Sequence, residues 1–502
     1  MVRIDFLKNH PQHVETVARW IFEAWGDGTP EGSARAVARV RDRLNDDGVP
    51  LTLVALDGGE PVGTVSLFEQ DLEGWNDLSP WLAALYVVEG RRSEGIGTML
   101  ADRVVAVAFE IGRTRIYLQA QDAAGFYSDQ GWLRVGSAHT ERGETTVFTR
   151  HTSTSPRILY RADGGLQLGF GHVMHAVRLE ALLRAQGVAE VVVVGAGDDS
   201  VDGLLRQHGM PARFDVTELG EGDTTLALAR DLGAAAVAVN LPKDSLERAT
   251  GLFEALKGAG IPQIHFDDPM QTVRFADLAI NALPHPDWGL DLAGLASVYE
   301  GLEYLLVDDD FVRAVAAKRQ RSAPPTRVLV SMGGTDPQNL STLVLQGLEF
   351  AGFTGLAHVV LGAGNPHSIA VHEAARAVGF DVDIHDHLPS LAPLVGEVDL
   401  AFSALGLTTY EFALAGLPVV LIAGSEFNAS VANLHADRGS ALSLGYYRDW
   451  TAESLGEELR GILEDSELLG DLASAGPQLV DGKGAERVGR LVVELLSKES
   501  RA

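Results

Sequence analysis

Short runs rich in β-branched residues alternate with amphipathic helical segments through most of the chain after residue 156. The runs include VAEVVVVGAG, AAAVAVNLP and PQIHFDD, and patterns such as AVRLEALLRAQG and LERATGLFEALKGAG lie between them. Strands that alternate with helices in this way pair in parallel sheets. The alternation pauses at AAKRQRSAPPT, residues 316–326, and resumes with RVLVSMGGTDPQN. The sequence therefore predicts two successive Rossmann-like lobes, at residues 157–315 and 325–495.

The first 150 residues form a separate segment. A polar stretch, RHTSTSPR at residues 150–157, divides it from the alternating part and is typical of a linker. We therefore expect an α/β protein with a domain at residues 1–150, followed by the two lobes facing each other. Ligands of such lobes bind in the crevice at the carboxyl ends of the strands.

Composition excludes several kinds of site. The chain of 502 residues has no cysteine, which excludes disulfides, thiolate metal sites and cysteine nucleophiles. Its formal net charge of −29 argues against a nucleic-acid partner, although helix N-termini can still hold a small anion. We expect no membrane span, no signal peptide and a cytoplasmic protein. We also expect no metal, and assign His385 and His387 in DIHDHLP to a strand-end loop.

The stretch LAALYVVEGRRSEGIGTMLADRVVAVAFE, residues 82–110, predicts a strand, a glycine-containing loop and a long helix. Its R-x-x-G-x-G spacing would turn backbone N–H groups toward a pyrophosphate, with the helix N-terminus adding positive potential. The alternative is that the glycines only turn the chain. The candidate cofactor-binding residues are Arg92, Gly95, Ile96, Gly97 and Thr98.

Together with LQAQDAAGFYSDQGW, which carries Tyr127 after a strand, this segment resembles the GNAT acetyltransferases. The resemblance implies acetyl-CoA as cosubstrate, and a Tyr127 that protonates the departing CoA thiolate. Ala123, Phe126, Gly131 and Trp132 also fit the family pattern approximately.

Two points in this segment stay open. Glu94 departs from the family pattern, because a carboxylate beside a pyrophosphate is unfavourable unless it points away. The general base is Glu69 or Asp71, either of which could equally be a solvated carboxylate at a strand end.

A histidine stands where the first lobe begins its first helix. RILYRADGGLQLGFGHVMH predicts a strand, a loop with Gly169 and Gly171, and His172 near the start of the helix. A helix N-terminus disfavours protonation of an imidazole, so His172 could stay neutral and accept a proton as a general base. The alternative is that it merely caps the helix.

The second lobe offers loops suited to a diphosphate. Glycines and hydroxyls follow two of its predicted strands, and a glutamate lies one turn into the second of the helices, where it suits ribose hydroxyls. For each loop alone, a turn with a helix cap is the alternative. The candidates are Gly333, Gly334, Thr335, Ser403, Gly406, Thr408, Thr409 and Glu411.

Residues 157–490 resemble the UDP-sugar hydrolases of pseudaminic acid biosynthesis and the related spore-coat polysaccharide proteins. The matching pieces include RADGG, GFGHVM, HFDD, ADLAINALPH, YEGLEYLLVDDDF, VLVSMGGTDPQN and TTYEFALAGLPVVLIA. The resemblance implies a GT-B fold and a metal-free reaction. In that reaction His172 activates water to displace UDP from a 2,4-diacetamido-2,4,6-trideoxyhexose.

The resemblance is weaker at the positions around the part of the cleft that would hold the sugar. The family has arginine at the position of His175 and at that of Val307, and different residues at Asn240 and Leu241. The motif A-E-N-Q is blurred into AGSEFNASVAN.

Three hypotheses follow from the sequence. The first is a bifunctional enzyme that N-acetylates an amino sugar nucleotide and hydrolyses a UDP-linked amino sugar. The second is a GT-B glycosyltransferase with an acceptor alcohol in place of water. The third is a non-catalytic UDP-sugar binder attached to an active acetyltransferase. The sequence gives no oligomeric state.

Overall fold

The computed structural model describes residues 2–26, 28–76, 78–121, 124–128, 130–141, 143–152, 156–166, 168–210, 214–215, 224–268, 271–283, 297–315, 324–362, 365–386, 388 and 390–499. The chain divides into two compact units. The first comprises Met1–Pro156 and Asp202–Phe214, and the second comprises Arg157–Val201 and Asp215–Ala502.

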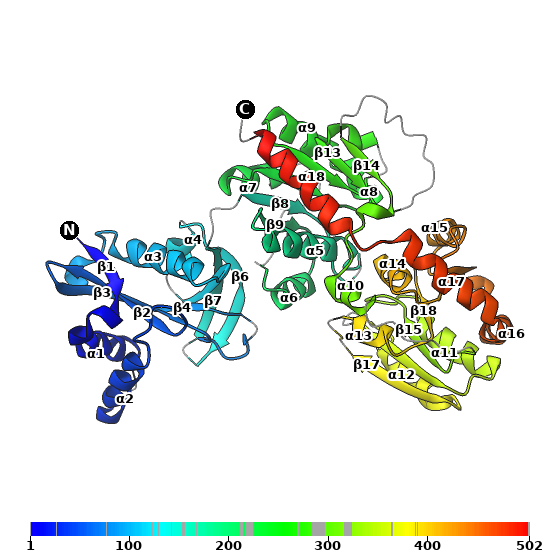
Figure 1. Ribbon diagram of the computed structural model, residues 1–502, viewed down its shortest axis with the longest axis horizontal. Coiled ribbons are helices and arrows are strands. Elements are labelled where there is room, and N and C mark those ends of the chain that lie inside the picture. The colour runs from blue at the N-terminus through cyan, green and yellow to red at the C-terminus, as the bar shows by residue number, and fades with distance from the viewer. Residues whose placement is uncertain are drawn as a thin grey trace. The chain divides into compact units, whose positions relative to one another are not determined.

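The first unit is built on one mixed sheet whose described strands run in the order β1-β2-β3-β4-β5-β7-β6 (Figure 1). These strands are β1 (Arg3–Phe6), β2 (Leu51–Asp57), β3 (Glu60–Phe68), β4 (Trp81–Val87), β5 (Arg115–Ala120), β6 (Leu133–Thr140) and β7 (Gly143–His151). The helices are α1 (Val14–Trp25), α2 (Pro30–Arg41), α3 (Ile96–Glu110) and α4 (Ala124–Ser128), with short 3₁₀ turns at Leu7–Asn9, Pro11–His13 and Glu89–Arg91.

Strands β4 and β5 are parallel, unlike the other paired strands described in this sheet. They pair at Trp81 with Tyr117 and at no later residue. Beyond that point the two backbones do not hydrogen-bond to each other, so the sheet parts toward the carboxyl ends of these strands. The start of α3, after β4, and α4, after β5, flank the parting.

The first sheet of the second unit has the order β10-β9-β8-β11-β12-β13-β14. Its strands are β8 (Arg157–Arg161), β9 (Glu190–Gly195), β10 (Phe214–Asp215), β11 (Ala236–Val239), β12 (Gln263–Phe266), β13 (Leu278–Asn281) and β14 (Val298–Glu300). The helices of this lobe are α5 (Gly171–Ala185), α7 (Thr225–Asp231), α8 (Lys243–Arg248), α9 (Thr250–Gly258) and α10 (Asp309–Val315), with 3₁₀ turns at Gln271–Phe275 and Leu302–Tyr304. α6 (Asp199–Gln207) begins in this unit, and its residues from Asp202 onward fall in the first unit.

The second sheet of this unit has the order β17-β16-β15-β18-β19-β20. Its strands are β15 (Arg327–Ser331), β16 (Leu356–Leu361), β17 (Asp381–Asp386), β18 (Leu400–Ser403), β19 (Val419–Ala423) and β20 (Leu442–Tyr446). The helices are α11 (Leu340–Ala351), α12 (Ser368–Ala377), α13 (Ala392–Val395), α14 (Leu407–Leu414), α15 (Glu426–Ala436), α16 (Ala452–Glu464), α17 (Ser466–Leu479) and α18 (Gly484–Glu499), with a 3₁₀ turn at Tyr447–Asp449.

The two parallel sheets share one winding pattern. In each, the first strand lies in the middle, the second and third follow on one side, and the fourth and later strands follow on the other. The direction of winding therefore reverses between β8 and β11, and again between β15 and β18. In doubly wound sheets the crevice that binds ligands opens at this point, beyond the carboxyl ends of the strands. The predicted α/β fold class is confirmed.

The last helix returns to the first lobe. α18 lies against α5 and β13 (Figure 1). Arg487 Nη1 donates to the Glu303 carbonyl at 2.8 Å. A Cβ at Gly484 would lie 2.0 Å from the Leu305 carbonyl oxygen, so only glycine permits this close approach. In the described part of the chain, no helix combines the length and the apolar character needed to cross a membrane.

Candidate functional sites

The loop Arg92–Thr98 leads into α3 with the geometry of an anion site. Gly95 has a φ of +78°, which a glycine adopts without strain, and no side chain caps the start of the helix. A Cβ at Gly97 would meet its nearest neighbours, Phe126 and Val87, only at 3.9 Å. Packing therefore does not demand glycine at this position, but its bare backbone leaves room for a ligand. The Ile96 side chain is buried in the core, so only its backbone can serve a cofactor.

Glu94, the carboxylate in this loop that departs from the family pattern, forms an ion pair with Arg91. Arg91 Nε donates to Glu94 Oε2 at 2.9 Å, and Arg91 Nη1 contacts Asp57 at 3.1 Å. Glu94 therefore faces a cation. The neighbouring Arg92 donates from Nε to the Val87 carbonyl at 3.2 Å, which leaves its terminal nitrogens for a ligand.

Tyr127 lies beside this loop. Phe126, its neighbour on α4, lies 3.9 Å from the position that a Cβ would take at Gly97, and Gln130 Nε2 donates to Thr98 Oγ1 at 3.0 Å. The Tyr127 ring is 8% exposed and makes an edge contact with Trp132 at 5.9 Å. Burial raises the pKa of the phenol to about 12, so it keeps its proton at neutral pH, as a general acid must. Ala123 of the predicted motif lies outside the described residues.

The two candidate bases differ in their surroundings. Glu69 is exposed and held on both oxygens, by Arg113 at 2.7 Å and by the Ser79 hydroxyl at 2.5 Å. Asp71 is half-buried and accepts from Gln119 Nε2 at 3.1 Å. Burial raises the Asp71 pKa, which strengthens it as a base. The structure therefore favours Asp71.

In the second unit, the loop after β8 is folded back on itself. Gly165 and Gly169 exchange both backbone hydrogen bonds, at 3.1 and 2.8 Å, and both have positive φ. α5 then begins at Gly171, which places His172 in its first turn. The loop therefore presents the start of α5 at the point where the winding of the first sheet reverses.

His172 is hydrogen-bonded to a residue that follows β11, across the reversal point from β8. Its Nδ1 lies 2.6 Å from Oδ1 of Asn240, which directly follows β11. Because an amide oxygen only accepts, Nδ1 carries the proton and the lone pair is on Nε2. Burial lowers the His172 pKa, although the Asn240 bond and the Asp163 charge oppose this shift. At neutral pH the imidazole is uncharged and can accept a proton.

His175, which stands where the resembled family has arginine, is a core residue. Its Nδ1 lies 2.7 Å from the Tyr160 hydroxyl, and its ring centre lies 4.6 Å from that of Phe266. Burial, followed by the Arg178 charge, lowers its pKa to about 3. A neutral histidine thus fills the space where an arginine would place a charge.

The loop after β15 differs from the predicted diphosphate loop in one respect. Gly333, with φ +85°, Gly334 and Thr335 follow the strand as predicted. Asp336 then accepts from the backbone N–H groups of Leu340, at 2.7 Å, and Ser341, at 3.0 Å. The start of α11 is therefore occupied by a carboxylate, so any phosphate here would use the glycine loop itself.

The loop after β18 leaves its helix start open. No side chain caps α14 at Gly406, and Thr408 in the first turn is half-buried. The hydroxyls of Ser403 and Thr409 are buried and donate to the Ala404 carbonyl, at 2.9 and 3.4 Å. The N–H groups of α14 and the Thr408 hydroxyl are thus the donors in this loop that can face a diphosphate.

Glu411 is 2% exposed and carries a bond to the other lobe. Arg178 on α5 donates from Nη2 to Glu411 Oε1 at 2.6 Å, and from Nη1 to the Leu306 carbonyl at 3.1 Å. Burial raises the Glu411 pKa, and the Arg178 charge opposes that shift. Glu411, which the sequence predicts to bind ribose, thus uses one carboxylate oxygen in an ion pair between the two lobes.

Among the described residues, His358, Asp383 and His385 could together hold a metal ion. His358 Nδ1 lies 3.0 Å from His385 Nε2, and Asp383 Oδ2 lies 3.3 Å from His385 Nε2. His358 pairs with Asp383 within the strands β16 and β17, away from the carboxyl ends that carry the candidate residues above. His385 lies within β17, so its assignment to a strand-end loop was wrong, and His387 lies outside the described residues.

Residues 14–132 match the family model described as Acetyltransferase (GNAT) family. The first unit contains a GNAT domain. Its predicted cosubstrate, acetyl-CoA, is the acetyl donor of the domain. The parting of β4 and β5, the glycine loop and Tyr127 all lie within the matched residues.

The remainder of the chain is similar to one polysaccharide biosynthesis protein and to one uncharacterized protein. It is 26% identical over 355 residues to the spore coat polysaccharide biosynthesis protein SpsG of Bacillus subtilis, covering 67% of this chain and 98% of that protein. It is 23% identical over 279 residues to the uncharacterized protein MJ1062 of Methanocaldococcus jannaschii, covering 54% and 56%. The Acinetobacter baumannii MurG structure covers 68% of this chain and all of that chain, with 18% identity and a TM-score of 0.50. The predicted GT-B fold is confirmed.

The sequence did not point to several residues of these sites. Asn240 was noted only as a departure from the family pattern, and Asp336 and Arg178 were not singled out. Each is brought to its partner by the fold, since Arg178 and Glu411 are 233 positions apart in the chain. A polar residue directly after a strand beside the reversal point was the available signal for Asn240.

Proposed function

We propose that the chain is a bifunctional enzyme of sugar-nucleotide metabolism. Its GNAT domain transfers an acetyl group to the amine of an amino sugar nucleotide. Its C-terminal domain hydrolyses a UDP-linked sugar of the 2,4-diacetamido-trideoxyhexose type, for nonulosonic acid or surface polysaccharide biosynthesis. The similarity to a spore coat polysaccharide biosynthesis protein supports the second assignment. Both substrates would be met in the cytoplasm.

In the acetyl step, the amine nitrogen attacks the thioester carbonyl, and the carbon–sulfur bond breaks. Asp71 takes the proton that the amine loses, directly or through water. Tyr127 gives its proton to the departing thiolate. The loop Arg92–Thr98 holds the pyrophosphate of acetyl-CoA with the N–H groups at the start of α3.

The C-terminal proposal rests on the hydrogen bond between His172 and Asn240. It holds an uncharged imidazole in the crevice of the first lobe with the lone pair on Nε2. Nε2 takes a proton from water while the water oxygen bonds to the anomeric carbon, and the bond from that carbon to the UDP oxygen breaks. The products are the free sugar and UDP.

The second lobe would bind the nucleotide. The Gly333–Thr335 loop and the open start of α14 would contact the diphosphate, with Thr408 as a hydroxyl donor. Glu411 has one oxygen bonded to Arg178, so its other oxygen is assigned to the ribose. Gly169 and Gly171 bring the first lobe close to the sugar.

The test is UDP release by the full chain from a panel of UDP-amino sugars, with no acceptor alcohol present. Release at a steady rate supports hydrolysis. Release only after an alcohol is added indicates a glycosyltransferase, and binding without release indicates a non-catalytic binder. Either of these results contradicts the proposal. Acetylation of the same panel, followed through the CoA thiol, tests the other half independently.

A further inference from the structure

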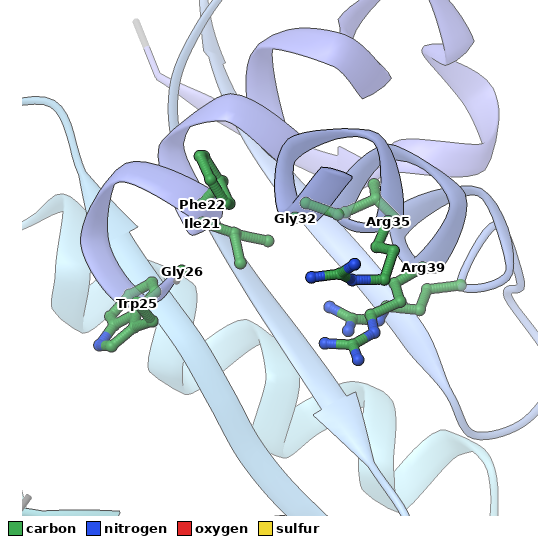
Figure 2. A pocket seen from close by; sticks show the side chains of 10 residues that line it. Ile21, Phe22, Trp25, Gly26, Gly32, Arg35 and Arg39 are labelled. Atoms are coloured by element: carbon green, nitrogen blue, oxygen red, sulfur yellow. The ribbon is translucent and has the colours of Figure 1, made fainter. Parts of the chain in front are cut away.

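A cavity of about 320 Å³ lies between α1 and α2 of the GNAT domain. Its two walls differ in character. Ile21, Phe22 and Trp25 of α1 form an apolar and aromatic wall, while Arg35, Arg39 and Arg43 line it from α2 and the residues just after it. Figure 2 shows Arg35 and Arg39 reaching from α2 toward the side of α1.

The three arginines are spaced four residues apart and therefore follow one face of the chain. Like charges at this spacing repel, and none of the described residues that line the cavity carries a carboxylate. Burial and the Arg39 charge together lower the Arg43 pKa. Three cations therefore gather around one cavity in a chain whose net charge is −29.

The helix dipole does not explain this arrangement. A helix favours basic residues in its last turn, and α2 has Arg39 and Arg41 there. Arg41 satisfies that preference while lying outside the cavity lining. The dipole gives no reason for Arg35, one turn earlier, or Arg43, beyond the helix, to line the same cavity as Arg39.

The cavity is electrostatically connected to the acetyl-transfer site. The Arg43 guanidinium carbon lies 4.2 Å from the ring centre of Phe68, the last residue of β3. The Arg43 charge acts on the carboxyl of Asp71, three residues further on, and the Asp71 charge acts on Arg43. Arg43 is therefore the part of the cavity wall that lies toward the proposed base.

The walls define the ligand by its chemistry. Guanidinium groups bind phosphate oxygens in pairs, which makes arginine the preferred residue for phosphate recognition. Trp25, 41% exposed, and Phe22 offer flat apolar surface of the kind on which a nucleobase stacks. The volume falls within the range of pockets for small organic molecules.

We propose that this cavity binds the nucleoside diphosphate part of the acetyl acceptor, so that the amine reaches Asp71 on a sugar nucleotide and not on a free amino sugar. This inference rests on the proposed function and specifies the acceptor of its first step. Arg35 and Arg39 hold the diphosphate, the aromatic wall takes the base, and Arg43 lies on the side toward Asp71.

The test is calorimetric titration of the full chain with UDP, in the presence of saturating CoA. The double variant Arg35→Gln/Arg39→Gln should lose one UDP site relative to the wild type, because each charged hydrogen bond contributes about 10–100-fold in affinity. Arg41→Gln, on the same helix but outside the cavity, is the matched control and should titrate like the wild type. A double variant that keeps every wild-type UDP site overturns the proposal.

Three further titrations identify the ligand and show whether the double variant is folded. Uridine and inorganic pyrophosphate should each bind the arginine-dependent site more weakly than UDP. Pyrophosphate binding as tight as that of UDP would overturn the assignment of a nucleotide. Unchanged acetyl-CoA affinity in the double variant shows that the domain is folded, since both arginines are exposed.

This result is independent of the C-terminal reaction. The comparison counts UDP sites relative to the wild type, so loss of one site can be detected whether or not the C-terminal domain binds UDP. Failure of the proposed hydrolysis would appear instead as absence of UDP release from the wild-type protein.

Discussion

Tyr127 and His172 are two of the three groups to which we assign proton transfer, and burial shifts their pKa values in opposite directions. Tyr127 lies on α4 among aromatic rings, and burial raises its pKa to about 12. His172 lies in the first turn of α5 against Asn240, and burial lowers its pKa. In both cases the protein disfavours the charged form.

The comparison shows that burial prepares Tyr127 as an acid in the GNAT domain and His172 as a base in the C-terminal domain. The uncharged form of a phenol carries the proton, whereas the uncharged form of an imidazole lacks one. Neither group needs a charged partner to be ready at neutral pH. His175 shows the limit of the effect, because its pKa falls to about 3 where the ring is fully enclosed.

Replacing the base should have the largest effect. We expect His172→Ala to slow UDP release by about 10²–10⁴-fold, the usual loss when a general base is removed. UDP affinity should stay near the wild-type value, because the second lobe is assigned the nucleotide. The measurement is the UDP release rate, with affinity from calorimetry.

His175→Gln is the matched control for that variant, since the two histidines share α5. It should lower thermal stability, because it disturbs the contacts with Tyr160 and Phe266, but largely keep the UDP release rate. If His172→Ala retains the wild-type rate, the residue only caps α5 and the comparison with Tyr127 is lost.

Removing the acid should cost less. We expect Tyr127→Phe to reduce acetyl transfer by about 10²-fold, at the low end for acid–base catalysis, because a thiolate with a parent pKa near 8.5 is a stable leaving group. CoA thiol release measures the rate. Since the Tyr127 pKa is about 12, the wild type should show no basic decline from this residue below about pH 11.

Variants of Glu69 and Asp71, which follow β3, test which carboxylate is the base of the GNAT domain. Asp71→Asn should reduce acetyl transfer by about 10²-fold, whereas Glu69→Gln, which changes an exposed ion pair with Arg113, should leave the rate near wild type. Acetyl-CoA affinity should be unchanged in both variants. The reverse order of rates would show that Glu69 is the base.

The smallest expected effect concerns the residue that holds His172. Asn240→Ala should slow UDP release by about tenfold or less, the range for a neutral hydrogen bond. The wild-type rate should fall only below about pH 6.5 as His172 gains a proton, because its pKa is lowered from that of free histidine. Because the Asn240 bond opposes the lowering, its loss should move the acid limb to lower pH. If the acid limb of the pH–rate profile does not move in Asn240→Ala, Asn240 does not set the His172 pKa in this way.

The sequence is sufficient to predict the glycine loops and the residues near helix starts, because turns and hydrophobic periodicity are local patterns. It therefore predicts the positions of Gly95, Gly169 and His172 relative to their helices, and the alternation predicts the parallel sheets. The same reasoning could not choose between Glu69 and Asp71. That choice depends on Arg113, in the connection between α3 and β5, and on Gln119 in β5.

Other features depend on contacts that no local pattern contains. The arginine spacing on α2 is visible in the sequence, but the aromatic wall opposite comes from α1. Asp336 accepts from N–H groups four and five positions further on, while Asn339 directly precedes α11, so no simple capping pattern marks these bonds in the sequence. The return of α18 to the first lobe is a property of topology alone.

That return has a consequence for synthesis of the chain. The first lobe ends near residue 315, but the helix that covers part of it begins only at Gly484. At translation rates of about 5–20 residues per second, roughly 10–30 s separate the two events on the ribosome. During this interval the surfaces of α5 and β13 that later contact α18 are open to water and to other nascent chains. Slower translation of the second lobe would lengthen that exposure.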